Sequence, residues 1–203
     1  ASAKAVEMDL TSAATAVRDT ELYDKILILI RPGESVYSSF EKNWVEAGNE
    51  PDKAVLSDDY PCDGPMTGKG CGQILDLSRR TAIFCNDDTG LVPELFAVSP
   101  LKRAVQSALL AFPTSAPGSI RDTPWICNSD LIERAGIKAD FVSSADDLEK
   151  VFPGIDYSHY RKTMIPAEVN SFEGRNVIDS KKELLQQTDN FLDWIKKRDE
   201  RVI

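Results

Sequence analysis

The sequence lacks the residues that metal centres usually need. Its 203 residues include one histidine, His159, and four cysteines that form no Cys-x-x-Cys pair. Zinc sites typically combine closely spaced cysteine pairs with further cysteines or histidines. We therefore expect neither a metal site nor a cofactor, and we expect the cysteines to be reduced thiols or to form one disulfide; they are Cys62, Cys71, Cys85 and Cys127.

Long apolar runs and an excess of positive charge are also absent. No apolar run is longer than the one at 26–30, far short of the ~20 residues that a membrane-spanning helix needs. The net charge is −9, with 24 Lys and Arg against 33 Asp and Glu. Nucleic acid is therefore not an expected partner, because phosphate backbones are bound by clustered Lys and Arg. The 42% hydrophobic and 28% charged residues are ordinary for a globular domain.

The N-terminal residues 1–24 are expected to form an arm in front of a single domain at 25–203. They contain no long apolar core, so they are not an intact signal peptide. Their Ala- and Ser-rich composition is what a removed transit peptide could leave, which favours a chloroplast or mitochondrial location, with the cytoplasm as the alternative. The arm is either a short amphipathic helix or a frayed terminus.

Strand-like and helical patterns alternate along the rest of the chain. Strands are expected at 25–30, at 94–100 and in the first part of 123–134, which continues as a polar segment. Helices are expected at 36–48, 67–84, 100–112, 143–154 and 180–203. The strand at 25–30 is expected to be fully buried, since it is an unbroken apolar run. The segment 156–176 is expected to be an irregular lid or insertion. This alternation predicts a three-layer α/β/α sandwich with a mostly parallel central sheet.

Two of these helices carry an apolar stripe at helical spacing, and two begin with a capping box. The capping boxes are Ser144 with Asp147 and Ser180 with Glu183. The stripe of the helix at 100–112 comprises Leu101, Ala104, Val105, Ala108, Leu109 and Phe112. The stripe of the last helix comprises Leu184, Thr188, Phe191, Leu192 and Ile195.

Two arginines are expected at the same edge of the sheet. Arg31 directly follows the strand at 25–30, and Arg103 lies in the first turn after the strand at 94–100. Ligands of open parallel sheets bind outside the carboxyl ends of the strands, and guanidinium groups match phosphate oxygens in a planar fork. The pair therefore predicts a phosphate site. The alternative is a structural ion-pair network with Glu34 or Glu133.

Four short segments occur in a distinctive order: RPGES at 31–35, DGPMTGKG at 63–70, SPLKRAVQSA at 99–108 and LIE at 131–133. With the long helix that follows, the chain from about 25 to 203 resembles the histidine phosphatase superfamily, which includes the cofactor-dependent phosphoglycerate mutases. The resemblance implies a phosphoglycerate mutase-like sandwich. It also implies that Arg31 and Arg103 bind phosphate, and that Glu133 occupies the proton-donor position, with a plain surface acid as the alternative reading. Gly33, Glu34 and Ser35 match the loop after the nucleophile.

The chain departs from that superfamily at the nucleophile. Where the superfamily has its reactive histidine, this sequence has Pro32. Proline has no titratable side chain and no backbone N–H, and it keeps Arg31 extended. Loss of a covalent nucleophile has reduced turnover elsewhere by about 10⁶-fold. The superfamily carries a second histidine on a strand after the last helix, and the sequence given reaches only ERVI, where that strand is expected to begin.

We therefore expect a catalytically inactive histidine-phosphatase-like domain, a pseudoenzyme that acts as a binding or structural module. Its expected partners are a phosphorylated ligand or the proteins of a larger complex. The alternative is an active phosphatase or phosphomutase that acts on a small phosphoester with a non-standard nucleophile. Candidates for that nucleophile are Ser35, Cys62 and Cys71.

Several other polar or aromatic residues receive a structural interpretation. His159 matches neither catalytic position and is expected to be an exposed loop residue, because a general base needs hydrogen-bond reach to its target. A solvated loop is expected for Asp58, Asp59 and Asp63, rather than a metal site. The three tryptophans are expected to pack in the core or an interface; they are Trp44, Trp125 and Trp194.

Overall fold

The computed structural model describes residues 24–56, 59, 61–85, 91–119, 123–132, 142–163 and 181–203. The N-terminal arm up to residue 23, the proton-donor candidate Glu133, Asp58 and the capping residue Ser180 lie outside these residues. The predictions made for them therefore remain predictions.

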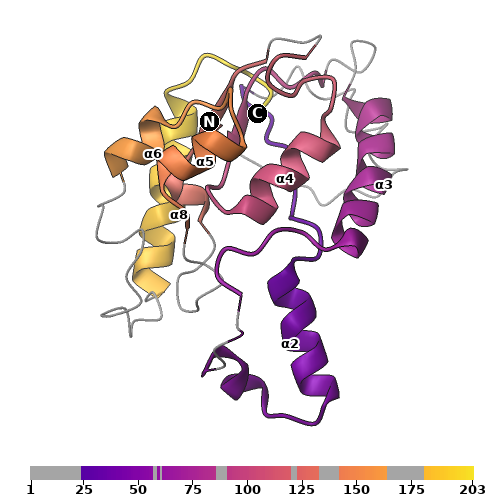
Figure 1. Ribbon diagram of the computed structural model, residues 1–203. Coiled ribbons are helices and arrows are strands. Elements are labelled where there is room, and N and C mark those ends of the chain that lie inside the picture. Colours follow the sequence, from indigo (N-terminus) through magenta and orange to yellow (C-terminus); the bar gives the residue numbers. More distant parts are fainter. Residues whose placement is uncertain are drawn as a thin grey trace.

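Helices and short strands alternate along the described chain, which is a mixed α/β structure (Figure 1). With η for a 3₁₀ helix, the elements are α2 (Val36–Glu46), η2 (Pro51–Leu56), α3 (Gly68–Phe84), β1 (Phe96–Val98), α4 (Lys102–Ala111), β2 (Trp125–Cys127), η3 (Ser129–Leu131), α5 (Ala145–Val151), α6 (Ser158–Thr163) and α8 (Lys181–Lys196). Figure 1 shows α2 and η2 extending away from the rest of the molecule. No described helix has the length and apolar character needed to cross a membrane.

A small parallel sheet lies at the centre. Strands β1 and β2 are hydrogen-bonded in parallel, with Phe96 opposite Trp125 and Val98 opposite Cys127. Isolated parallel bridges extend this pairing from Ile26 to Val202 and from Ile126 to Asp156. The N–H of Glu94 also donates to the carbonyl of Val202. The backbone segments therefore lie in the order 26, 202, β1, β2 and 156.

The expectation of a fully buried strand at 25–30 is wrong. In this run only Ile26 takes part in a bridge, and Leu29 is 77% exposed. An apolar run forms a buried strand only when chain segments cover it on both edges and both faces. Among the described residues, segment 201–203 pairs with the beginning of this run and nothing pairs with its end.

The other strands and most of the helices agree with the sequence. Helix α3 begins after Thr67, whose side chain accepts from the N–H of Gly70, and α5 begins after Ser144, which bonds Asp147 as the capping box predicts. Helix α4 begins at Lys102, two residues after Pro100. Part of the segment expected to be irregular folds as α6, whose Tyr160 is buried. Burial of this aromatic residue favours a helix that the local sequence does not signal strongly.

The hydrophobic core joins the sheet to α4, α5 and α6. Trp125 is buried between β1 and the loop after α4, stacked on Phe96 with ring centroids 4.2 Å apart, and its Nε1 donates to the carbonyl of Ser115. Trp44 packs in a small separate cluster around Ala54, and Trp194 stacks on Phe191. The tryptophans thus pack structurally, as expected.

The apolar stripes are only partly buried. On α8, Ile195 is buried and Phe191 and Leu192 are half-buried, whereas Leu184 is 40% exposed and Thr188 is exposed. The predicted stripe of α8 is therefore wrong in its first half. The buried residues of α4 include two polar ones, Arg103 and Ser107, that an apolar pattern cannot reveal.

Candidate functional site

Three of the sequence segments singled out above meet at one place. The carbonyl of Glu34 accepts from the N–H of Thr67 at 2.9 Å, and the N–H of Glu34 donates to Oε1 of Gln73 at 2.9 Å. The N–H of Gly33 donates to Oγ of Ser107 at 3.1 Å. Segment 31–35 is therefore held against the beginning of α3 on one side and against α4 on the other.

Two glycines permit this close approach of backbones. A Cβ atom placed on Gly33 would lie 2.5 Å from the carbonyl oxygen of Gly70. A Cβ atom placed on Gly70 would collide with backbone atoms of Glu34. Glycine is the residue that allows one backbone to lie directly on another. The glycines of RPGES and TGKG therefore serve the packing of the two segments.

Arg31 and Arg103 line one hollow of about 990 Å³, together with Pro32. The hollow lies between segment 27–33, β1, α4 and one side of α2, and Ile203 also lines it. Arg103 is only 3% exposed, and its guanidinium lies 5.9 Å from the ring centroid of Tyr37, within range of a cation–π contact. Arg31 is exposed. The structure therefore brings the two predicted arginines to the same cavity.

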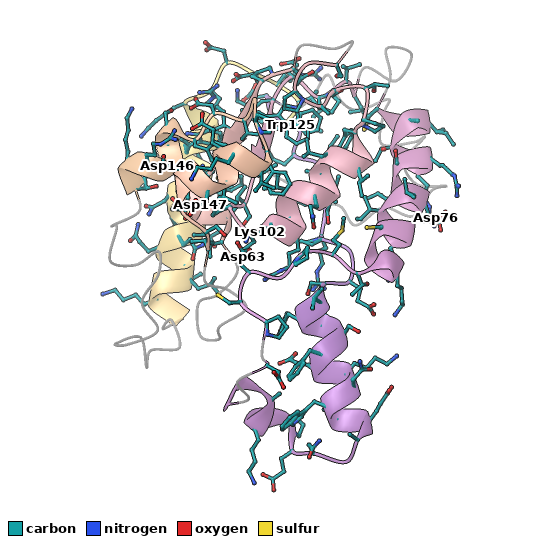
Figure 2. All side chains as sticks on the ribbon, in the orientation of Figure 1. Asp63, Asp76, Lys102, Trp125, Asp146 and Asp147 are labelled. Carbon is teal, nitrogen blue, oxygen red and sulfur yellow. The ribbon has the colours of Figure 1, made fainter. Side chains whose placement is uncertain are left out.

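A buried carboxylate fixes the helix that carries Arg103. Asp63 is 3% exposed, and its Oδ1 accepts from the N–H of Lys102 at 2.8 Å, at the beginning of α4 (Figure 2). Its Oδ2 accepts from Oγ of Ser143 at 2.7 Å and lies 3.7 Å from Nζ of Lys102. Leu101, at the N-cap, makes no side-chain hydrogen bond. Asp63 therefore caps α4 from a distant segment.

The sequence interpretation of Asp63 as part of a solvated loop is wrong. Its partners lie 39 and 80 residues away in the chain, so no local pattern marks it. The one local signal is the Asp-Gly-Pro turn, because Asp63 has φ of +43°, a conformation that Asp tolerates better than most residues. Asp59 is exposed, as expected.

Glu34, one of the two acids proposed to pair with the arginines, forms an ion pair with Lys69. Its Oε2 lies 2.6 Å from Nζ of Lys69, and its Oε1 accepts from Oγ1 of Thr67 at 3.0 Å. The hydrogen bond from Lys69, followed by that from Thr67, lowers the pKa of Glu34. Glu34 thus holds segment 31–35 to the beginning of α3.

Of the three alternative nucleophiles, only Ser35 lines the hollow. Its side chain is buried, and its Oγ accepts from the N–H of Ser38 as the N-cap of α2. Cys62 and Cys71 form no disulfide, and they are not among the residues described as lining the hollow. Cys85 and Cys127 are also free, and burial raises the pKa of Cys85 to about 11 and that of Cys127 further. None of the four cysteines is disulfide-bonded in this structure.

His159 is not the exposed loop residue that the sequence suggests. It lies on α6 with its side chain 24% exposed, its Nε2 is 4.0 Å from Oδ2 of Asp130, and its ring centroid is 5.9 Å from that of Trp194. Burial raises the pKa of Asp130, and the nearby His159 opposes this shift. His159 therefore packs at the junction of α6, η3 and α8, and it is not among the described residues that line the hollow.

No group of three or more His, Cys, Asp or Glu within the described part of the chain is arranged to hold a metal ion. The cavity has apolar walls and two guanidinium groups, one of them buried, and Glu41, Lys42 and Glu46 of α2 also line it. Such a site can bind an anion and exclude water from part of it.

Comparison with the known protein families finds no match for this chain, and comparison with curated proteins likewise finds none.

Proposed function

We propose that this chain is a binding module that holds a phosphorylated ligand in the hollow through Arg31 and Arg103 and does not hydrolyse it. In this proposal the chain is a degenerate member of the histidine phosphatase superfamily, with a phosphoglycerate mutase-like α/β/α sandwich in which Pro32 replaces the nucleophile. Its role is to recognise a phosphoryl group, either on a small molecule or within a protein complex.

The observation that carries the proposal is the composition of the hollow. Arg31 and Arg103 line it together with Pro32, and its described lining contains neither histidine nor cysteine. Two guanidinium groups provide paired donors for phosphate oxygens. Proline provides no group that could accept a phosphoryl group. The described lining therefore offers donors for a phosphoryl group but no histidine or cysteine nucleophile.

The burial of Arg103 adds to this argument. A guanidinium that is 3% exposed is expensive to remove from water unless nearby groups or a bound anion compensate its charge. The ring of Tyr37 contributes to that compensation. An anion bound in the hollow would be a further favourable partner for this guanidinium.

An active phosphatase with a displaced nucleophile is less well supported. It would require Ser35, the only one of the three candidates at the hollow, to leave its capping position at the beginning of α2. Loss of an N-cap costs about 1 kcal/mol. The described hydrogen-bond partners of its Oγ are the N–H and the hydroxyl of Ser38, and neither is a general base.

Calorimetric titration of the chain with inorganic phosphate tests this proposal. We expect saturable binding at a 1:1 ratio, weakened about tenfold in Arg31→Ala, because a hydrogen bond to a charged group contributes about 1.5 kcal/mol or more. Arg79→Ala is the matched control, since Arg79 is 78% exposed on α3, away from the hollow, and the substitution removes the same charge.

Equal loss of phosphate affinity in the two variants would show that only net charge matters and would refute the site. Absence of any heat or thermal shift at millimolar phosphate would refute phosphate binding altogether.

A further inference from the structure

Helix α3 is covered on one side and open on the other. It packs on α4 and on segment 31–35, and Oγ1 of Thr81 donates to a carbonyl of α4. On the opposite side Leu75 is 48% exposed and Ile83 is 66% exposed, and a Cβ atom at Gly72 would meet nothing within 4 Å. Figure 1 shows α3 along one side of the molecule. Exposed apolar residues gathered on one side of a helix commonly mark an interaction surface.

The open side of α3 has the spacing with which one helix packs on another. Exposed residues follow one another there at alternating intervals of four and three, which keeps them in one row along the helix. The row consists of Gly68, Gly72, Leu75, Arg79 and Ala82. Asp76 and Ile83, which are also exposed, lie beside it. We call these seven residues the outer face of α3.

The residues of the outer face increase in size along the helix. Its first half contains Gly72, and its end carries Ile83. If two copies of α3 pack antiparallel about a two-fold axis between positions 77 and 78, Ile83 of each copy lies over Gly72 of the other. Leu75 then lies beside Ala82 of the other copy. A parallel arrangement would instead place Ile83 against Ile83 and leave a gap between the glycines.

The charges of the outer face select the same arrangement. Nη1 of Arg79 lies 2.6 Å from Oδ1 of Asp76, and both side chains are more than half exposed. Figure 2 shows Asp76 on the side of α3 away from α4. The same two-fold axis places Asp76 of each copy opposite Arg79 of the other, so that two ion pairs form across the interface. Parallel helices would place like charges together.

The other charged residues of α3 lie at the margin of this face. Lys69 is paired with Glu34, which belongs to the segment that covers the opposite side of the helix. Arg80 follows Asp76 by one helical turn and is exposed beside it. Neither residue lies in the row at the centre of the outer face. Size and charge are therefore both self-complementary about one axis, and a second copy of α3 satisfies both.

We propose that two copies of this chain associate through α3, with the two helices antiparallel about a two-fold axis level with Leu77 and Ser78. One pair of helices buries less than the roughly 1,200 Å² of a stable interface. We therefore expect a reversible dimer with a dissociation constant in the micromolar range or above. No residue of α3 belongs to the described lining of the hollow, so this inference does not depend on the proposed function.

An exchange of charges between two variants tests the inference on the full chain. Sedimentation velocity from micromolar to millimolar protein is expected to show self-association of the native chain. Asp76→Arg and Arg79→Glu should each weaken it at least tenfold, because two attractive contacts become repulsive. In an equimolar mixture one chain carries two positive charges at these positions and the other two negative charges. We therefore expect heterodimers with near-native affinity, identified by their mass in native mass spectrometry.

Helix α8 offers matched controls. Asp193 and Lys196 form an exposed ion pair with the same spacing, so Asp193→Arg and Lys196→Glu make the same kinds of charge change away from the outer face. We expect both to leave self-association within twofold of native. Ile83→Gln should weaken it at least tenfold, because the side chain over the glycine of the other copy becomes polar. Leu185→Gln, at a residue that is 56% exposed on α8, should leave it within twofold.

Three results would overturn the inference. One is a native chain that stays monomeric up to millimolar concentration. Another is an equimolar mixture that associates no more strongly than either charge variant alone, since rescue between chains requires the two ion pairs across the interface. The last is an equal loss of association in the variants of α3 and α8, which would show that only net charge matters.

Discussion

The variant Asp63→Ala is expected to be less stable than the native chain by about 3 kcal/mol. Three donors lose their acceptor: the N–H of Lys102, and the N–H and hydroxyl of Ser143. Loss of a helix cap costs about 1 kcal/mol, and each buried donor left without a partner adds about 1 kcal/mol or more. Alanine also tolerates the left-handed backbone at this position less well than aspartate. Denaturant unfolding measures the loss.

Asp63→Asn is the informative companion variant. Asparagine tolerates a positive φ and keeps one acceptor oxygen, so we expect a loss of about 1–2 kcal/mol, intermediate between native and alanine. Asp76→Ala is the matched control, because Asp76 is exposed on α3 and pairs only locally with Arg79, and we expect a change within about 0.5 kcal/mol. Equal stability of Asp63→Ala and Asp76→Ala would contradict the capping role of Asp63.

The variant Gly70→Ala is expected to lose about 2 kcal/mol of stability. Its Cβ atom would collide with the backbone of Glu34, and backbone atoms cannot move aside as the end of a side chain can. Overpacking of this kind costs about 1–3 kcal/mol. The clash also acts on segment 31–35, which carries Arg31 and Pro32. We therefore expect weaker phosphate binding in the fraction that remains folded.

Gly72→Ala provides the control within the same helix. A Cβ atom at Gly72 meets nothing within 4 Å, and replacement of glycine by alanine inside a helix stabilises it by about 1 kcal/mol. The two substitutions should therefore shift the midpoint of denaturant unfolding in opposite directions. Stabilisation by both would mean that segment 31–35 does not lie against α3 as described.

Much of the secondary structure could be predicted because its signals are local. The capping serine at Ser144, the glycine-containing beginning of α3 and the short strands β1 and β2 are marked by neighbouring residues. The run at 25–30 could not be judged in this way. Its composition indicates a covered strand, but whether a strand is covered depends on segments far away in the chain, as the exposure of Leu29 shows.

The arginines of the candidate site could be predicted from the sequence, but the residues that hold the surrounding segments in place could not. Arg31 and Arg103 follow strand-like segments, and the ends of parallel strands meet at one edge of a sheet. Asp63 and Ser107 act across long sequence separations, so no short pattern identifies them. The expectation of an exposed loop position for His159 fails for the same reason. Its neighbours Asp130 and Trp194 belong to other elements.

Incubation of the native chain with p-nitrophenyl phosphate, with binding and hydrolysis measured on the same sample, tests directly whether the hollow binds a phosphoester without cleaving it. We expect the ester to compete with inorganic phosphate for the hollow, Arg31→Ala to weaken this competition, and nitrophenolate to be released no faster than in buffer. Hydrolysis by the native chain that is lost in Arg31→Ala and retained in Arg79→Ala would contradict it.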